Sequence, residues 1–273
     1  MIDLHLHTTA SDGTLSPAAL VGRAAAAGIT VASVTDHDTI AGLAQARAAA
    51  ADLRITLVNG IEITAIAGEK DVHLLGYFFD VGSAPLAAFL ARQRADRVRR
   101  LHDLLDRLAA LGLKIDSEPL VDAAASASGP SIGRPQIADA LVAAGHVRDR
   151  GDAFDRWLGD GRPAFVPRRG STPEEVIDLV RRAGGISSLA HPGLLKMDAL
   201  VPQLAAAGLT ALEVRHSEHD ADIERHYREM AARCDLAVSG GSDFHGDFVH
   251  GARVLGAVTL PPEDYAGLEA RAR

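Results

Sequence analysis

Histidine and carboxylate side chains fall in short clusters along this sequence. Twelve of the 273 residues are histidine, and they are unevenly placed. His5-Leu6-His7 and Asp243-Phe244-His245 share one spacing, with a single residue between the two polar side chains. Alternate residues of a strand point to the same face, so both side chains of each pair can reach one ion. Imidazole and carboxylate without thiolate suit Mn²⁺, Fe²⁺ or Zn²⁺. The two pairs therefore predict a metal site.

Further residues of metal-binding type follow other predicted strands. The full set of candidate ligands is His5, His7, Asp12, His37, Glu62, His73, His191, Asp243 and His245. These are more ligands than one ion needs. Two or three ions roughly 3.5 to 4 Å apart, bridged by a carboxylate, would use them all, and a metal-bound hydroxide would be the nucleophile at neutral pH. The set predicts hydrolysis of an anionic substrate.

Each of these signals has a simpler explanation when taken alone. Two histidines of one strand can face solvent, Asp12-Gly13 is a common turn, and Asp36 can cap a helix that begins near Thr39. The placement of so many such residues at strand ends favours metal binding over these explanations. We expect Asp36 and Asp38 to cap that helix or to support the ligands, without binding metal themselves.

The elements that would position these side chains alternate between strands and helices. Strands are predicted at residues 1–6, 31–34, 56–63, 72–79, 164–166, 186–189, 211–214, 236–238 and 254–258. Helices are predicted at 16–27, about 39–51, 173–183, about 199–206 and 221–233. The predicted fold is an α/β barrel of parallel strands surrounded by helices, in which loops after the strands meet at one face.

The alternation stops between residues 83 and 162. This segment is rich in Arg, Asp, Leu and Ala, and its helical pattern breaks at Gly112, at 126–129 and at Gly145. We predict an inserted helical subdomain at 83–162. The barrel would then be built from a first part, 1–82, and a second part, 163–273.

The motifs together resemble those of the PHP (polymerase and histidinol phosphatase) superfamily of metal-dependent phosphoesterases. The matching segments, which span nearly the whole chain, are His5-Leu6-His7, Ser11-Asp12-Gly13, Thr35-Asp36-His37-Asp38, Gly60-Ile61-Glu62, His73, Ala190-His191-Pro192 and Gly241-Ser242-Asp243-Phe244-His245. The resemblance implies a distorted (β/α)7 barrel. It also implies two or three divalent ions, expected to be Mn²⁺ with Fe²⁺ or Zn²⁺ as alternatives.

The same resemblance implies a role for each ligand. The first ion would be held by His5, His7, Glu62 and Asp243. The second would be held by the bridging Glu62 with His73 and His191, and the third by Asp12, His37 and His245. The residues implied to be catalytic are Asp12, His37, Glu62 and Asp243.

Within the superfamily, the short N-terminal lead, the helical insert and Gly133-Arg134-Pro135 most resemble one branch. It contains 3′,5′-nucleoside bisphosphate phosphatases and 5′-3′ exonucleases that act on short oligonucleotides. The expected reaction is hydrolysis of a phosphate monoester of a small nucleotide such as a 3′,5′-nucleoside bisphosphate. Three alternatives are an exonuclease on short RNA or DNA, a phosphatase for histidinol phosphate or another small metabolite, and a PHP module that binds metal without catalysis. The chain has Gln136 where the branch often has His, and Arg215 where it often has Tyr.

Four residues outside the ligand set are candidates for contact with substrate: Arg134, Arg168, Arg169 and His216. Arg134 starts a predicted helix, where free backbone amides and the helix dipole favour an anion. The other three follow predicted strands at the same end of the barrel. The acid that protonates the leaving oxygen would be Asp12, Asp36 or His216.

An arginine-rich helix is predicted within the insert. Its arginines are Arg92, Arg94, Arg97, Arg99, Arg100 and Arg107. Asp96, Asp103 and Asp106 lie three or four residues from several of them and would pair with them along the helix surface. This pattern favours a solvated structural face over a phosphate-binding one.

Overall composition limits the partners. The net charge of −8 disfavours binding to duplex nucleic acid. The single cysteine, Cys234, cannot form an intrachain disulfide, and the sequence shows no signal peptide. No apolar stretch approaches the ~20 residues of a membrane span. These features predict a cytoplasmic protein that acts on a small phosphorylated substrate or a short oligonucleotide.

Overall fold

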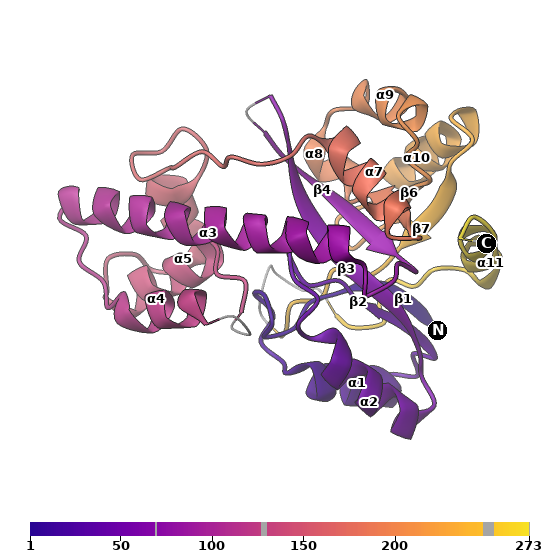
Figure 1. The fold of residues 1–273 in the computed structure, drawn as a ribbon, viewed down its shortest axis with the longest axis horizontal. Helices are drawn as coiled ribbons and strands as arrows, with labels where there is room; N and C mark the ends of the chain where they lie inside the picture. Colours follow the sequence, from indigo (N-terminus) through magenta and orange to yellow (C-terminus); the bar gives the residue numbers. More distant parts are fainter. Residues whose placement is uncertain (69, 127–129, 248–253, 273) are drawn as a thin grey trace.

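A seven-stranded sheet forms the centre of the computed structural model, which describes residues 1–68, 70–126, 130–247 and 254–272 (Figure 1). The strands follow chain order in the sheet: β1 (Ile2–Leu6), β2 (Val31–Val34), β3 (Thr56–Ala67), β4 (Lys70–Tyr77), β5 (Ile186–Leu189), β6 (Ala211–Arg215) and β7 (Ala237–Gly240). Past the ends of β1 and β7, the N–H of His7 donates to the carbonyl of Phe244 at 3.0 Å. The sheet is therefore a nearly closed barrel, which confirms the predicted fold class.

The direction of β4 corrects the expectation of a wholly parallel barrel. β4 runs antiparallel to both β3 and β5, whereas the other neighbouring pairs are parallel. Only two residues separate Ala67 from Lys70. A parallel connection would need a crossover of a dozen or more residues, so this one can join only antiparallel strands. The register pairs His73 with Thr64, so His73 enters the site from the middle of a strand.

Two of the predicted short strands are wrong. Residues 164–166 form a loop, in which the N–H of Ala164 donates to the carbonyl of Trp157 at 3.0 Å. Residues 254–258 form turns, with a 3.0 Å hydrogen bond from the N–H of Ala257 to the carbonyl of Val254. A short apolar run suits a buried loop as well as a strand, and only the presence of a neighbouring strand distinguishes the two.

Helices cover the barrel on its two sides, with α1 and α2 on one side and α7, α9 and α10 on the other (Figure 1). They are α1 (Pro17–Ala26), α2 (Leu43–Leu53), α7 (Pro173–Arg182), α8 (Pro192–Leu195), α9 (Leu200–Ala206), α10 (Ala221–Arg233) and α11 (Pro262–Ala270). Ser16 caps α1 as predicted, because its side chain accepts from the N–H of Ala19 at 3.3 Å. The second helix begins at Leu43, four residues later than expected from Thr39, and α11 was not predicted.

A helical layer extends from the barrel along α3 (Ala84–Ala110), with α4 and α5 beside its outer half (Figure 1). Its other elements are α4 (Glu118–Ala125), α5 (Arg134–Ala143), α6 (Arg150–Ala153) and a π-helix at Phe154–Leu158. The layer has its own hydrophobic cluster, which includes Leu101, Leu104, Leu108, Ile137, Leu141, Ala164 and Val166. The subdomain limits 83 and 162 stay a prediction. No helix in the described ranges has both the length and the apolarity to cross a membrane.

Candidate metal centre

A cavity of about 310 Å³ lies where the barrel meets the helical layer. One part of its wall is made of candidate ligands: Asp12, His37, Glu62, His73, His191, Asp243 and His245. The other part includes Asp71, Arg97, Ser131, Arg134, Gln136 and Arg168. His5 and His7 are completely buried and contact the first group. The structure therefore brings together all nine candidate ligands.

Glu62 lies at the middle of the cluster. Its Oε1 is 2.8 Å from His73 Nδ1 and 3.1 Å from His191 Nε2. Its Oε2 is 3.3 Å from His5 Nε2 and 3.2 Å from both His7 Nε2 and His37 Nδ1. One carboxylate thus lies among five imidazoles, with each oxygen facing a different subset. This arrangement suits a carboxylate that bridges two cations.

Asp243 and Glu62 are the two carboxylates of one group of candidate ligand atoms. Asp243 Oδ1 is 3.3 Å from His5 Nε2 and 3.2 Å from His7 Nε2. Atoms of His5, His7, Glu62 and Asp243 all lie within 4.8 Å of one another. The HxH pair at the end of β1 thus points both imidazoles to one spot, as the spacing predicted.

Asp12 organises a second group on the opposite side of His7. Its Oδ1 is 3.3 Å from His245 Nε2 and 3.8 Å from His7 Nδ1, and its Oδ2 is 3.8 Å from His37 Nε2. Ligand atoms of Asp12, His7, His37 and His245 again fall within 4.8 Å of one another. A third group joins His37, Glu62 and His73.

The hydrogen bonding of the cluster fits a shared cation. His7 Nδ1, His7 Nε2, Asp12 Oδ1, His37 Nδ1 and His73 Nδ1 are buried and make no hydrogen bond within the described part of the chain. His7 Nε2, His37 Nδ1 and His73 Nδ1 lie 3.2, 3.2 and 2.8 Å from oxygens of Glu62 without forming a hydrogen bond there. Buried polar atoms in proteins are normally hydrogen-bonded, so such a convergence calls for a missing partner. Nitrogen and oxygen donors in this arrangement fit a divalent metal ion.

The charges of the cluster support the same interpretation. Burial opposes ionisation of Glu62, but the imidazoles of His73 and His5 help to hold its pKa well below the usual range. Burial likewise disfavours charge on His7, yet the Asp243 and Glu62 carboxylates raise its pKa to about 10. Burial lowers the pKa of His37 to about 3, so this imidazole stays neutral. The carboxylates are therefore ionised, and at least one imidazole has lone pairs available to a metal.

The backbone is strained where two ligands enter the cluster. Asp243 has φ of 51° and His191 has φ of 30°, in the left-handed region that non-glycine residues rarely adopt. Gly241 lies so close to β1 that a Cβ there would be 2.4 Å from the nitrogen of His5. The approach of β7 to β1, which brings Asp243 to His5, therefore requires glycine at position 241.

Asp36 and Asp38 support the loops around the site. Asp36 accepts from the N–H of Thr8 at 2.7 Å, from its hydroxyl at 2.7 Å and from the Ser11 hydroxyl at 2.6 Å. Asp38 accepts from the N–H of Thr64 at 2.8 Å and pairs with Arg97. These contacts agree with the expectation that neither residue is a ligand.

Three arginines, Arg97, Arg134 and Arg168, form the far wall of the cavity, and Arg100 lies beside Arg97 and Arg134 next to that wall. We call these four residues the arginine cluster. Arg168 Nε is 2.9 Å from Asp71 Oδ2, and an Arg134 guanidinium nitrogen is 3.3 Å from the same oxygen. The Nε of Arg97 donates to Asp38 at 3.0 Å. Arg100 is 4% exposed and Nη2 of its guanidinium makes no hydrogen bond within the described residues. Arg134 also pairs with the exposed Asp160, at 2.8 Å, so four cations lie beside buried Asp38, partly buried Asp71 and exposed Asp160.

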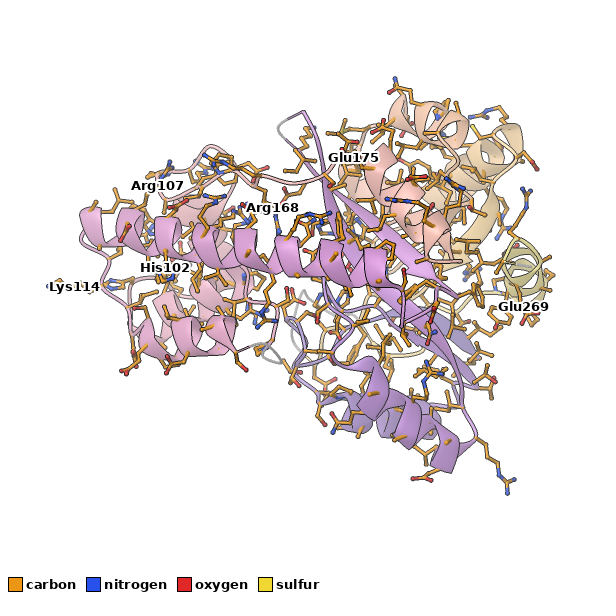
Figure 2. All side chains as sticks on the ribbon, in the orientation of Figure 1. His102, Arg107, Lys114, Arg168, Glu175 and Glu269 are labelled. Carbon is orange, nitrogen blue, oxygen red and sulfur yellow. The ribbon has the colours of Figure 1, made fainter. Side chains whose placement is uncertain are left out.

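The arginine cluster corrects the prediction of a fully solvated arginine face on α3. Arg99 does pair along the helix surface, with Asp96 at 2.7 Å. Arg97 lines the cavity instead, and Arg100 is buried against the carbonyl of Val166. Burial next to Arg168 and Arg134 lowers the pKa of Arg100 to about 9. Figure 2 shows Arg168 near the middle of α3, whereas Arg107 and His102 lie along its outer half. Helical periodicity places residues on faces, but only packing determines which face meets the barrel.

The four residues expected to contact substrate are separated by the fold. Arg134 and Arg168 line the cavity. Arg169 is exposed and is not part of the cavity wall. His216 is buried behind Asp243, with its Nε2 3.2 Å from Asp243 Oδ2, and its Nδ1 accepts from the N–H of Glu218. His250 lies outside the described residues.

Glu213 and Arg97 contribute to the site but were missed in the sequence. Glu213 is completely buried in β6 and contacts His5 at 2.8 Å. Its signal was a charged residue inside the apolar run Ala211–Val214, where a strand buried on both faces normally carries none. Arg97 gave no separate signal, because it is one arginine among six on the same predicted helix.

Comparison with known proteins extends over nearly the whole chain. The PHP domain family model matches residues 3–125. A 5′-3′ exoribonuclease of Haemophilus influenzae is 36% identical over 248 residues, 89% of this chain and 89% of that protein. A 3′,5′-nucleoside bisphosphate phosphatase of Chromobacterium violaceum is 34% identical over 267 residues, 96% of this chain and 93% of that protein. A solved structure from Bifidobacterium adolescentis, of a predicted metal-dependent phosphoesterase, aligns with a TM-score of 0.89 and 33% identity over 98% of this chain and 95% of that one.

Proposed function

Because the chain belongs to the PHP family of metal-dependent phosphoesterases, we propose that it removes one phosphate from a small nucleotide that carries two. The expected substrate is a 3′,5′-nucleoside bisphosphate, and the products are a nucleoside monophosphate and phosphate. The relative from Chromobacterium violaceum is named for this activity.

The observation that supports two phosphates is the arginine cluster on the wall opposite the candidate metal centre. Arg97, Arg134 and Arg168 of this cluster line the same cavity of about 310 Å³ as the candidate ligands. Buried like charges are costly unless an anion neutralises them. Here the four guanidinium groups lie beside three carboxylates, because Asp38 and Asp71 pair with Arg97, Arg168 and Arg134, and Asp160 pairs with Arg134 at 2.8 Å. Arginine binds phosphate through paired hydrogen bonds. A substrate with one phosphate at the metal centre and another at the arginine cluster would place negative charge beside the cations on both sides of the cavity.

We propose Mn²⁺ as the ion, with Fe²⁺ or Zn²⁺ as alternatives, held by the nine candidate ligands in the groups described above. Bound divalent cations would supply charge stabilisation for the phosphate and lower the pKa of a water molecule. Glu62 would bridge two ions. Asp243 would share the group of His5, His7 and Glu62, and Asp12 would share the group of His7, His37 and His245. Arg134 and Arg168 would hold the phosphate that is not cleaved.

The three candidates for the leaving-group acid differ in position. Asp36 accepts three hydrogen bonds from Thr8 and Ser11, and Nε2 of His216 is directed to Asp243. Only Asp12 of the three lines the cavity. Burial favours the protonated form of Asp12, but the imidazoles around it, above all that of His245, hold its pKa well below the usual range, which suits a metal ligand better than a proton donor.

A second candidate function is 5′-3′ exonucleolytic cleavage of short oligonucleotides. The 36% identical relative from Haemophilus influenzae is named for exoribonuclease activity. The same metal centre would serve both reactions, and the arginine cluster would then bind a backbone phosphate. The two functions differ in how the rate depends on substrate length.

Steady-state phosphate release from 3′,5′-adenosine bisphosphate and from AMP tests the proposal. A charge-assisted hydrogen bond contributes about 1.5–3 kcal/mol, so we expect kcat/KM to be roughly 10- to 100-fold higher for the bisphosphate. Remote binding also helps to orient the reacting phosphate, so kcat should fall for AMP as well. Equal kcat/KM values would contradict the two-phosphate model, and rates that rise with oligonucleotide length would favour the exonuclease.

Arg134→Ala and Arg169→Ala form a matched pair for the same assay. Arg134→Ala should raise KM for the bisphosphate by roughly tenfold or more and change AMP hydrolysis little, because the variant removes a contact that AMP does not use. Arg169→Ala should behave like the wild type, since Arg169 lies off the cavity wall. Similar effects of the two variants would argue against a phosphate site at the arginine cluster.

A further inference from the structure

We propose that Glu213 is a positioning residue that fixes the tautomer of His5 and the backbone of His191, so that both imidazoles present Nε2 to the metal centre. The inference rests on the metal centre of the proposed function. Glu213 lies outside the nine candidate ligands, and its contact with His5 places the ring proton of that imidazole on Nδ1.

Glu213 divides its two oxygens between two of the candidate ligands. Its Oε1 is 2.8 Å from His5 Nδ1, and its Oε2 accepts from the backbone N–H of His191 at 2.7 Å. Glu213 lies on β6, while His5 is 208 residues away on β1. Both Glu213 and His5 are completely buried. A single carboxylate thus joins two candidate ligands that contact different oxygens of Glu62: His5 contacts Oε2 and His191 contacts Oε1.

The contact with His5 determines which ring nitrogen carries the proton. A carboxylate only accepts hydrogen bonds, so Nδ1 of His5 must be the donor. The neutral ring then has its lone pair on Nε2. That atom lies 3.3 Å from both Glu62 Oε2 and Asp243 Oδ1, at the centre of the first ligand group. A carboxylate behind a metal-binding imidazole fixes ring orientation and tautomer in this way.

The contact with His191 holds a strained turn in place. His191 follows β5 and has φ of 30° and ψ of 57°, which is costly for a residue with a side chain. Its N–H is directed to Glu213, and its Nε2 lies 3.1 Å from Glu62 Oε1. On the other side of Pro192, the N–H of Gly193 donates to His219 at 3.2 Å. Glu213 and His219 therefore fix the two sides of the turn that presents His191.

Glu213→Gln separates this role from simple packing, because glutamine has the same shape. The backbone N–H of His191 is always a donor, so the amide oxygen must face it. The amide NH₂ then faces His5 Nδ1, which becomes an acceptor, and the ring proton moves to Nε2. Nε2–H can still donate to Glu62 or Asp243, so the metal-free fold should persist. Nε2 of His5, now protonated, can no longer bind a cation.

The experiment compares Mn²⁺ binding to wild type, Glu213→Gln and Glu224→Gln by calorimetry and elemental analysis, with melting of the metal-free proteins. Glu224 on α10 is near Arg215, at 3.8 Å, and serves as the control for the same chemical change. We expect Glu213→Gln to weaken at least one Mn²⁺ site by about 10- to 100-fold with an unchanged metal-free melting temperature. Unchanged Mn²⁺ affinity, or equal losses in the two variants, would overturn the role of Glu213. A wild type that binds no Mn²⁺ would overturn the metal centre itself.

A second measurement needs only the wild-type protein. In the Zn²⁺-loaded form, the ¹⁵N shifts of the His5 ring report which nitrogen is protonated and which binds metal. We expect a proton on Nδ1 and zinc on Nε2. Zinc on Nδ1, or a proton on Nε2, would overturn the assignment whether or not Glu213→Gln folds.

Discussion

Glu62 illustrates why a single carboxylate can dominate this site. Its two oxygens face His73 and His191 on one side and His5, His7 and His37 on the other. An imidazole presents one lone pair in a given direction, whereas a carboxylate has two oxygens and can contact two ions. Histidines can therefore surround Glu62, but none of them can replace it.

We predict that Glu62→Gln and Asp243→Asn each reduce kcat by about two to four orders of magnitude while the fold survives. Each substitution keeps the shape and removes an anionic ligand. A metal ion contributes several kcal/mol of charge stabilisation, and 1.36 kcal/mol corresponds to tenfold in rate. Phosphate release measures kcat, circular dichroism checks the fold, and Glu224→Gln is the control. Normal turnover of Glu62→Gln would end the case for a bridging carboxylate.

Helix α3 has two different faces. One face packs against the site, and another is exposed to solvent. Arg97 reaches Asp38, and Arg100 donates to the carbonyl of Val166 at 2.7 Å. Arg99 pairs only along the helix surface, with Asp96 and Asp103. The helix therefore carries two kinds of arginine within four residues, and their energetic roles should differ.

Arg97→Ala should lower the free energy of unfolding by about 3 kcal/mol. It leaves the buried Asp38 carboxylate with Arg168, at 3.8 Å, as its one remaining ion-pair partner among the described residues. Arg99→Ala should cost less than about 1 kcal/mol, since its ion pairs are at the surface. Chemical denaturation of the two variants, two residues apart on one helix, measures the difference. Equal costs would show that Arg97 has no special role in compensating the charge of Asp38.

The candidate metal centre depends on the whole molecule, because its candidate ligands come from distant parts of the chain. They lie on or just after β1, β2, β3, β4, β5 and β7. Ionised Asp12, Glu62 and Asp243 meet at this pole of the barrel. Cations that bind there should therefore stabilise the folded chain more than the unfolded one.

Removal of metal should abolish activity and lower the melting temperature by several degrees. A ligand present at 100 times its Kd stabilises the folded state by about 2.7 kcal/mol, which corresponds to several degrees for a chain of this size. Mn²⁺ should restore both properties best among the divalent ions tested. Less than one equivalent of transition metal in protein grown with ample Mn²⁺, together with activity that a chelator leaves unchanged, would refute the prediction.

Local spacing was enough to locate much of this site. His5 and His7 share a face because strand side chains alternate, and that relation holds in any fold that makes residues 2–6 a strand. Motifs at strand ends were predicted to gather at one end of the barrel, and the structure brings all nine candidate ligands together there.

Other features depended on contacts between distant residues. The inward direction of Arg97 and Arg100 follows from how α3 packs on the barrel, which helical periodicity alone does not specify. The role of Glu213 depends on His5, 208 residues away, and on a turn at His191. Residues 164–166 have the composition of a strand, but they meet a helical layer where no strand pairs with them. A sequence indicates which side chains share a local face, whereas the partner of that face is determined when the whole chain packs.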